Sequence, residues 1–410
     1  MYKKFSKELN IIRKDPKLIL TLPIAFFILL LLRPFKKLFF FRFGFLHSDR
    51  IGHFAMNTEL SILEDKKFKI QSIYDFYYFG GKICNVFLGK KWSEFLNIFP
   101  KIFIRPFCLI SRRLNIFKHN IAGSTLSSDN DVMNLMEKYP SQIRLNKEEI
   151  KRGFDILKSI GVNKKSKIVC LIVRDEGYLT KIYGSRQNYH NFRNMKIHLF
   201  EKTVKMLIKK GYYVLRMGNY TKSKINISNK KYFDYSKSNI KSDFMDVFLG
   251  SECFFCISTN TGFDALPWIF RKPILYIGSL PFGIFSSNTK KIMVTSKIHY
   301  SKVKKNKLKM EEIFSNNLAF SLRGEDFVNK KIKFIEMSAD EIHNATVDML
   351  YYIKNDYSLK KMDNLKNDLF WKKYEKFYLK YRLKSRVHGQ IRCKISPSFL
   401  KKHQDWLLYN

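Results

Sequence analysis

The chain has 410 residues, 45% of them hydrophobic, and its 76 Lys and Arg against 35 Asp and Glu give a formal net charge of +41. A chain of this length and apolar content forms about two globular domains and is not an intrinsically disordered protein. The charge favours an anionic partner such as membrane lipid, a nucleotide or nucleic acid. Lys, Asn, Ile, Phe and Tyr are abundant together, as an AT-rich coding bias would produce, so part of the charge needs no functional explanation.

An apolar, uncharged segment covers residues 18–32, and basic residues flank it on both sides. A helix of this length spans about 22 Å, which is short of the roughly 30 Å of a bilayer core, and Pro23 is expected to interrupt it. We predict that residues 1–37 associate with the anionic cytoplasmic face of a membrane without crossing it. The alternatives are a short true span and a signal peptide, although no small-residue cleavage motif follows.

Residues 38–46 alternate enough to predict a first β-strand, followed by a loop over 47–53. Ser48 or Asp49 would cap the next helix, whose apolar residues are Phe54, Leu60 and Leu63.

This first strand–helix junction contains candidate functional residues. His53 is a candidate general base near neutral pH, and Glu59 a candidate to orient it or to bind substrate. Gly52 and Asn57 lie beside them. The alternative is that a lone histidine next to a glycine only packs or faces solvent.

The second half of the chain alternates strands and helices. Strands are predicted over 166–173, 212–215 and 253–257, and helices over 146–160, around 200–208 and around 243–248. A further strand is expected to start at Pro273. This alternation predicts a parallel sheet covered by helices, whose ligands lie beyond the carboxyl ends of the strands.

Arg174, Arg216 and the turn 258–262 all follow such strand ends. A guanidinium group offers planar donors and a fixed charge that suit a diphosphate. The small residues of the turn would let an anion approach the backbone N–H groups of a helix start. The alternatives are arginines paired with Asp175 or Glu176, and a turn that is merely tightly packed.

The segment 189–194 holds two aromatic residues, a histidine, an arginine and two asparagines. Such a loop is suited to stacking a base and binding sugar hydroxyls, and the alternative is a structural loop. The basic, aromatic tail from residue 355 is expected to form a solvated helix that packs a narrow face on the protein body.

Six cysteines without a repeating framework indicate reduced thiols, and the Cys253-x-x-Cys256 pair is predicted to lie in the core. The chain has no HExxH, Walker or GxGxxG motif, which argues against a metal site, a kinase, a P-loop protein and an ordinary dehydrogenase.

Several short motifs together resemble a family of bacterial glycosyltransferases associated with surface-polysaccharide synthesis. The resemblance covers the chain from about residue 40 to the C-terminus. Its motifs are RIGHF (50–54), NTE (57–59), VRD (173–175) with Tyr178, YHNFRN (189–194), RMG (216–218), DY (234–235), SDF (242–244) with Asp246, the segment 253–262, and ISPSFL (395–400).

The resemblance implies a GT-B-like α/β fold in which two Rossmann-like domains face a cleft, and metal-independent transfer with no cofactor. It implies catalytic roles for His53, Glu59 and Asp175, and an acceptor-side position for Gly52 and Asn57. The donor-binding residues it implies are Arg174, Tyr178, Asn191, Arg193, Asn194, Arg216, Gly218, Ser258, Thr259, Thr261 and Gly262. A more distant similarity to fucosyltransferases lacks their His-x-Arg pattern, because Ile172 stands in the histidine position.

The expected organisation is a membrane-associating segment (1–37), an acceptor-side α/β domain (38–160), a nucleotide-sugar-binding α/β domain (161–354) and a helical tail (355–410). The expected partners are a nucleotide-sugar donor, a lipid-linked or surface-polysaccharide acceptor and an anionic membrane surface on the cytoplasmic side of the plasma membrane. No nucleic acid is expected. The alternative functions are a non-catalytic scaffold of the same fold and a basic nucleic-acid-binding protein.

Overall fold

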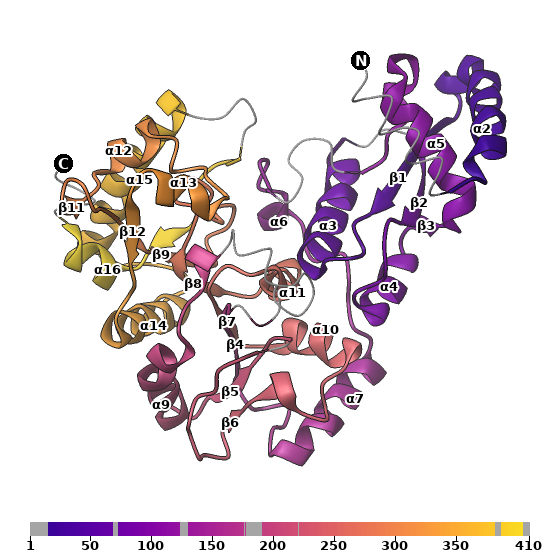
Figure 1. Ribbon diagram of the computed structural model, residues 1–410. Coiled ribbons are helices and arrows are strands. Elements are labelled where there is room, and N and C mark those ends of the chain that lie inside the picture. The colour runs from indigo at the N-terminus through magenta and orange to yellow at the C-terminus, as the bar shows by residue number, and fades with distance from the viewer. Residues whose placement is uncertain are drawn as a thin grey trace. The chain divides into compact units, whose positions relative to one another are not determined.

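The structure is a computed structural model that describes residues 15–68, 73–123, 130–175, 177, 191–219, 221–381 and 387–404 (Figure 1). The chain divides into two compact units, Met1–Asp129 and Asn130–Asn410. Glu176, the donor candidate Tyr178, and Tyr189 and His190 of the segment 189–194 lie outside the described residues.

The first unit alternates strands and helices around a small parallel sheet. Its strands β1 (Phe40–Leu46), β2 (Ile73–Phe79) and β3 (Asn97–Ile98) lie in that order and are all parallel. The helices are α2 (Leu18–Leu32), η1 (Arg33–Lys37), α3 (Ile51–Phe68), α4 (Val86–Ser93), α5 (Lys101–Arg113) and η2 (Asn115–Asn120). The predicted first strand is therefore confirmed, whereas residues 51–53 belong to the start of α3 and not to a loop.

A charged pair explains how an arginine fits within the first strand. Arg42 of β1 lies opposite Asp75 of β2 in the strand register, and its Nε donates to the Asp75 carboxylate at 2.6 Å. Opposite charges on facing strand positions stabilise the pairing.

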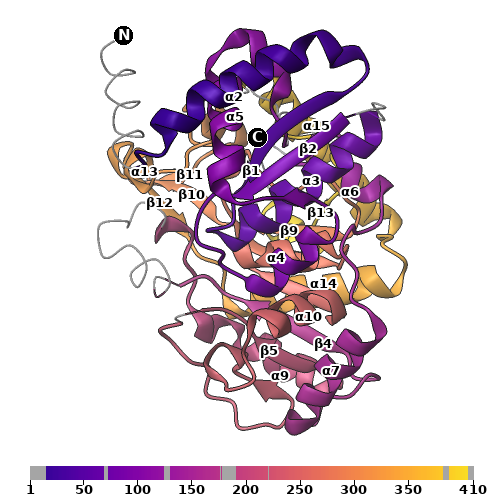
Figure 2. The same ribbon diagram turned by 90° about the vertical axis from the view of Figure 1, so that its right-hand side faces the viewer.

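Helix α2 packs against α5 and the sheet, as Figure 2 shows. Its residues Leu18, Ala25 and Leu29 are buried, and the last two join a core cluster that includes Phe43 of β1 and Ile104 and Cys108 of α5. The helix continues through Pro23, so the expected interruption is wrong. The proline lies in the second turn, where it removes a single backbone hydrogen bond from a helix that is held by packing.

The second unit is built on a seven-stranded parallel sheet with the order β13-β9-β8-β7-β4-β5-β6. These strands are β4 (Ile168–Ile172), β5 (Tyr213–Arg216), β6 (Tyr232–Phe233), β7 (Phe255–Ser258), β8 (Ile274–Ser279), β9 (Ile292–Ser296) and β13 (Lys394–Ile395). The strands predicted in the second half, including the one after Pro273, are confirmed. Both cysteines of the CxxC pair are buried and free, as predicted.

Helices cover both faces of this sheet (Figure 1). One layer contains η5 (Ile197–Phe200), α9 (Glu201–Lys209) and α14 (Ala339–Lys354). The other contains α7 (Lys147–Leu157), α10 (Asp243–Glu252), η7 (Gly262–Asp264) and α11 (Ala265–Ile269). The predicted helices near 146–160, 200–208 and 243–248 are thus present.

Helix α7 begins with a capping box between Asn146 and Glu149 and packs closely on α10. A Cβ atom on Gly153 would lie 2.2 Å from the ring of Phe248, so only glycine permits this approach. The helix belongs to the second unit, whereas the sequence placed residues 38–160 in the first domain. The expected boundaries at residues 37, 160 and 354 remain predictions.

The second unit also contains a three-stranded antiparallel sheet, which the sequence did not predict. Its strands β10 (Ile298–Ser301), β11 (Asn306–Lys307) and β12 (Ile332–Ile335) are antiparallel and follow the order β11-β10-β12. Other short helices of the second unit are α6 (Leu135–Lys138), η3 (Lys158–Ile160), η6 (Tyr235–Lys237), α12 (Met310–Ser315) and α13 (Gly324–Asn329).

The C-terminal tail is more deeply integrated than a helix with a narrow packed face. Helix α15 (Lys361–Tyr381) buries Asn367, Phe370 and Tyr374, and strand β13 adds to the large sheet beside β9 before α16 (Pro397–Lys402) begins. The Asn367 side chain donates to the Ile395 carbonyl at 3.0 Å and accepts from the Ile395 N–H at 2.7 Å. This amide thus supplies Ile395 with hydrogen bonds of the kind that another strand would make.

Candidate functional site at the carboxyl edge of the large sheet

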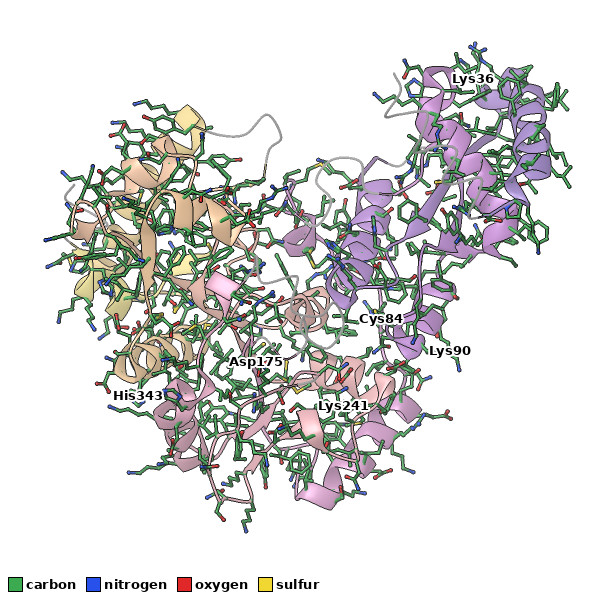
Figure 3. The ribbon with its side chains drawn as sticks, viewed as in Figure 1. Lys36, Cys84, Lys90, Asp175, Lys241 and His343 are labelled. Atoms are coloured by element: carbon green, nitrogen blue, oxygen red, sulfur yellow. The ribbon has the colours of Figure 1, made fainter. Side chains whose placement is uncertain are left out.

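The predicted convergence of strand ends occurs between β4 and β7. These strands are neighbours, and the Arg174 N–H donates to Thr259 Oγ1 at 2.7 Å while the Thr259 N–H donates to the Ile172 carbonyl at 3.1 Å. Asp175 lies beside these central strands in Figure 3. Parallel strands end at a common edge, which is why residues so distant in sequence meet here.

The turn over residues 258–262 is held mainly by its own hydrogen bonds. The Asp264 carboxylate accepts from the Ser258 hydroxyl at 2.5 Å and from the Thr261 N–H at 2.8 Å. The Asn260 N–H donates to Ser258 Oγ at 3.1 Å, and the Phe263 N–H donates to Thr261 Oγ1 at 3.2 Å. The helix that follows is only one 3₁₀ turn and five residues of α-helix, so its dipole is weak.

These bonds change the expected chemistry of the turn. The N–H groups of Thr259, Asn260, Thr261 and Phe263 already have acceptors within the protein. Gly262 is exposed, and no hydrogen bond of its N–H is found among the described residues. Among the described residues, the Gly262 N–H is therefore the one backbone donor of this turn that is left for a ligand. An anion bound here needs side-chain donors as well.

The segment 191–194 supplies such side chains and is fixed against the same edge. Arg193 Nη2 donates to the Asn260 carbonyl at 2.6 Å, and Asn194 Nδ2 donates to Asn191 Oδ1 at 3.3 Å. The buried ammonium of Lys297 donates to the carbonyls of Phe192 at 3.0 Å and Asn194 at 2.6 Å. Arg174, Asn191, Arg193 and Asn194, which the family resemblance assigned to one donor site, are thereby brought to one place, and their donor-binding roles remain predictions.

Phe192 itself is not a base-stacking platform. Its ring packs against Phe327 at 5.0 Å and Phe334 at 5.8 Å between centroids, next to the three-stranded sheet. Phe192 therefore anchors the segment 191–194, which is the structural role given above as the alternative for this loop.

Arg216 has the environment of a structural arginine. Its side chain is fully buried, and its guanidinium lies 3.6 Å from the Asp175 carboxylate and 3.5 Å from that of Asp234, and also donates to the Ser223 carbonyl. Asp175 accepts the N–H groups of Gly177 and Lys222, both at 2.9 Å. These contacts match the paired-arginine alternative, and the donor-binding role of Arg216 and the catalytic role of Asp175 remain predictions.

Gly218 lies in the turn after β5 with a φ of +137°, where a side chain would be strained and would meet Thr221. Its predicted contact with a donor also remains a prediction.

Three residues of this edge escaped the sequence analysis: Asp264, Ser279 and Lys297. Asn260, which belongs to the predicted turn, adopts a left-handed conformation with a φ of +61°, which asparagine tolerates, and its amide donates to Ser279 Oγ and to the Leu280 carbonyl, both at 3.3 Å. Asp264 occupies the third position after the helix cap Thr261, a capping-box signal that was present in the sequence.

Burial gives Asp264 a pH-dependent effect on stability. Burial raises the pKa of this carboxyl to about 6, although its hydrogen bonds from Ser258 and Thr261 act in the opposite direction. Because the pKa in the folded state is above the unfolded value, the protonated group favours folding; this contribution is complete below about pH 4 and is lost as the pH rises through 6. Relative to Asp264→Asn, the wild type should lose up to about 3 kcal/mol of unfolding free energy between pH 4 and pH 8. Denaturant unfolding of both proteins at each pH measures the difference, and parallel curves would contradict the assignment.

The candidates of the first unit cluster at the start of α3. The rings of His47 and His53 lie 5.8 Å apart between centroids, and burial, followed by the His53 charge, lowers the pKa of His47. Asn57 lies one helical turn after His53, whereas Glu59 is buried about 120° around the helix from it. His47 was missed by the sequence analysis. The catalytic roles of His53 and Glu59 and the acceptor-side roles of Gly52 and Asn57 remain predictions.

The Ser48 side chain does not cap α3, because both of its hydrogen bonds go to Gly81 of the neighbouring loop. Its hydroxyl donates to the Gly81 carbonyl at 2.9 Å and accepts the Gly81 N–H at 3.1 Å. Within the described ranges, no group of three or more His, Cys, Asp or Glu side chains has an arrangement suited to a metal ion.

A scan against protein-family models gave no match, and a search of curated proteins also gave none. Among solved structures, the chain is similar to an ADP-heptose lipopolysaccharide heptosyltransferase II from E. coli, with 9% identity and a TM-score of 0.40 over 70% of this chain and 97% of that one. It is also similar to a glycosyl transferase family 9 protein from Veillonella parvula, with 10% identity and a TM-score of 0.40 over 72% and 96% of the two chains. TM-scores this low do not establish a common fold, and we therefore argue the function from the residues of this chain.

Proposed function

We propose that the protein is a metal-independent glycosyltransferase that transfers a sugar from a nucleotide-sugar donor to a lipid-linked or surface-polysaccharide acceptor. The observation that carries the proposal is the meeting of Arg174, Arg193 and Asn194 at the carboxyl edge of a parallel sheet, where α/β proteins bind ligands. The family resemblance of the sequence motifs supports the same reading.

The two guanidinium groups would neutralise the leaving diphosphate, a role that a divalent cation takes in other enzymes. The bond between the anomeric carbon and the diphosphate oxygen breaks, and the acceptor oxygen forms the new glycosidic bond. The acceptor hydroxyl gives up its proton to a base, for which His53 of the first unit is the candidate. The hydrogen-bonded turn over residues 258–262 would keep the donor site in one geometry before the ligand binds.

A nucleotide-sugar panel tests this function directly. ADP-, UDP-, GDP-, CMP- and TDP-sugars are incubated with the protein and EDTA, and thermal shift and release of the free nucleotide are measured. We expect one nucleotide class to raise the melting temperature and to be turned over when a glycan acceptor is added. Binding without turnover would favour the scaffold, whereas no shift with any nucleotide and salt-sensitive binding to unrelated DNA would favour the nucleic-acid-binding alternative.

We also propose that the first unit rests on a membrane through α2 and α5. By length and composition, one described helical stretch, Leu18–Lys37, is able to span a bilayer. However, one side of α2 packs on the protein, and four exposed side chains repeat on the other at helical spacing: Leu20, Ile24, Phe27 and Leu31, between 59% and 74% exposed. Phe103 of α5 is exposed as well, and Arg33, Lys36 and Lys37 follow the apolar side. An apolar face beside basic residues fits an interfacial helix on anionic lipid.

Removing two side chains of this face should weaken membrane binding. For Leu20→Ser/Phe27→Ser we expect at least about a tenfold loss of affinity for phosphatidylglycerol vesicles, because burying each side chain in lipid contributes on the order of 1.5–3 kcal/mol. Vesicle co-sedimentation measures the affinity. The matched control is Val328→Ser/Leu365→Ser, which removes two exposed apolar side chains from the second unit. Equal losses in both variants would contradict the proposal.

A further inference from the structure

The opposite edge of the large sheet contains a basic pocket that the proposed function does not use. The pocket has a volume of about 470 Å³, within the range of small-molecule sites, and it is lined by six basic side chains and a single acidic one, Glu252. The six are Lys164, Lys165, Lys167, Arg271, Lys272 and Lys291. Lys167 directly precedes β4 and Arg174 follows that strand, so the pocket and the donor site lie about 20 Å apart along it.

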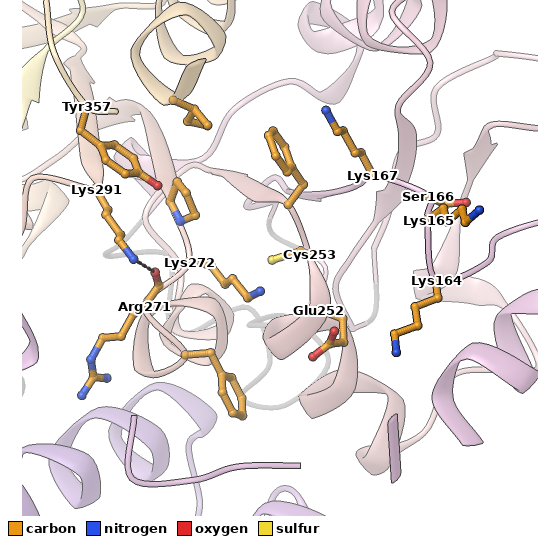
Figure 4. A pocket seen from close by; sticks show the side chains of 14 residues that line it. Lys164, Lys165, Ser166, Lys167, Glu252, Cys253, Arg271, Lys272, Lys291 and Tyr357 are labelled. Carbon is orange, nitrogen blue, oxygen red and sulfur yellow. Dashed lines mark hydrogen bonds between the residues drawn. The ribbon is translucent and has the colours of Figure 1, made fainter. Parts of the chain in front are cut away.

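The lysines surround the pocket from two sides, as Figure 4 shows: Lys272 and Lys291 on one and Lys164 and Lys167 on the other. Lys291 Nζ donates to the Arg271 carbonyl at 3.1 Å, and Lys167 Nζ lies 5.1 Å from the centre of the Phe254 ring. Neither contact neutralises a charge. Across the described part of the chain, no carboxylate forms an ion pair with any of the five lysines.

Arg271 lines the pocket, but its guanidinium is held by backbone carbonyls. It donates to the carbonyls of Tyr139 at 3.1 Å, Pro140 at 3.0 Å and Ile269, so each of its three nitrogens already has an acceptor. Burial and then the charges of Lys272 and Arg271 lower the pKa of Lys291, and Asp356 offsets them in part. The positive charges that line the pocket therefore act on one another.

Helix ends alone do not account for this concentration of charge. Helices α10 and α14 end at the pocket, and cations are favoured at helix C-termini because each carries about half a negative charge. These two termini together with Glu252 and Asp356 offset roughly half of the six positive charges. The remaining charge requires a bound anion or solvent counterions.

We propose that this pocket binds a phosphate-bearing ligand with at least two negative charges, at a site distinct from the donor site. Lysine ammonium groups bind phosphate as point charges, and several of them converging from two sides suit a diphosphate or a phosphorylated headgroup. Tyr357, Phe254 and Phe270 add aromatic walls for an attached apolar or planar group. The same chemistry is offered by a free phosphate compound and by an anionic lipid headgroup.

The test compares a pocket variant with a control of equal charge. Lys272→Gln/Lys291→Gln removes two inner lysines, and Lys164→Gln/Lys167→Gln removes two exposed ones in case the first variant does not fold. Lys209→Gln/Lys210→Gln, the α9 control, removes two exposed lysines at the C-terminal end of α9. Pyrophosphate is titrated calorimetrically into each protein in the Arg174→Ala background, which reduces binding at the donor site. Phosphatidylglycerol vesicles are offered in the Leu20→Ser/Phe27→Ser background, which reduces binding through α2.

We expect the pocket variants to lose at least about tenfold in affinity for one of the two probes while the α9 control retains it. Loss of pyrophosphate binding would identify a free phosphate compound as the ligand class, and loss of vesicle binding a lipid headgroup. Equal affinities in the pocket and control variants for both probes would overturn the proposal. This result is independent of the nucleotide-sugar test, because the donor site lies at the other edge.

Discussion

Replacing Arg174 with alanine is expected to lower the affinity for the nucleotide-sugar donor by about 10- to 150-fold. Charge-assisted hydrogen bonds contribute about 1.5–3 kcal/mol each, and Arg174 is one of two guanidinium groups at the proposed diphosphate position. The substitution is structurally mild, because Arg174 is tied to the turn through its backbone N–H, which alanine retains. Isothermal titration with the nucleotide that stabilises the wild type measures the effect.

The matched control is Arg152→Ala on α7. Arg152 is an exposed arginine of the same unit that lies over the Phe244 ring, so its removal changes the net charge equally. A folded Arg174→Ala protein that binds the donor as tightly as the control would refute the role of Arg174. Arg193→Ala is less diagnostic, because Arg193 also holds the Asn260 carbonyl.

Asn367→Ala is expected to release the C-terminal strand from the second unit. The amide of Asn367 satisfies both the N–H and the carbonyl of Ile395 in a buried position. Each buried group left without a partner costs about 1–3 kcal/mol, so the variant should lose about 2–5 kcal/mol of local stability. Hydrogen exchange of residues 387–404 measures this loss, and exchange in β4 and β7 should change much less.

Asn364→Ala, one helical turn earlier on α15, is the control. Asn364 bonds to the side chains of Lys394 and Asp368 near the surface and supports no buried backbone group. Faster exchange in both variants would show that the segment depends on α15 as a whole and not on the Asn367 amide.

The strands at the centre of the large sheet were predictable because they are buried on both faces. Such strands read as uncharged apolar runs, as in β4 and β7, and their helices carry clear caps such as Asn146. The three-stranded antiparallel sheet escaped prediction because its strands are only two to four residues long, and β13 because two residues give no periodic signal. The place of β13 in the large sheet depends on tertiary contacts from α15.

At the candidate site, the order of strands was enough to predict that Arg174 and the turn over residues 258–262 would meet, whereas Asn191, Arg193 and Asn194 were placed with them only through the family resemblance. The sequence did not reveal which hydrogen bonds the turn keeps for itself, because these depend on the buried Asp264. It also gave no sign of Lys297, whose ammonium is buried among backbone carbonyls and is indistinguishable in sequence from the many surface lysines. The pairing of Arg216 with Asp175 was predicted only as an alternative, and its contact with Asp234 was not predicted.

The late position of strand β13 in the sequence affects how the protein folds during its synthesis. Lys394 pairs with Met293, so the edge of β9 has no strand beside it until roughly a hundred further residues have been made. At typical rates of synthesis this interval lasts about 5 to 20 s. An open strand edge recruits other chains during such an interval, and crowded polysomes would bring nascent copies together. Slower expression at lower message density should therefore improve the soluble yield of this chain more than a stronger promoter.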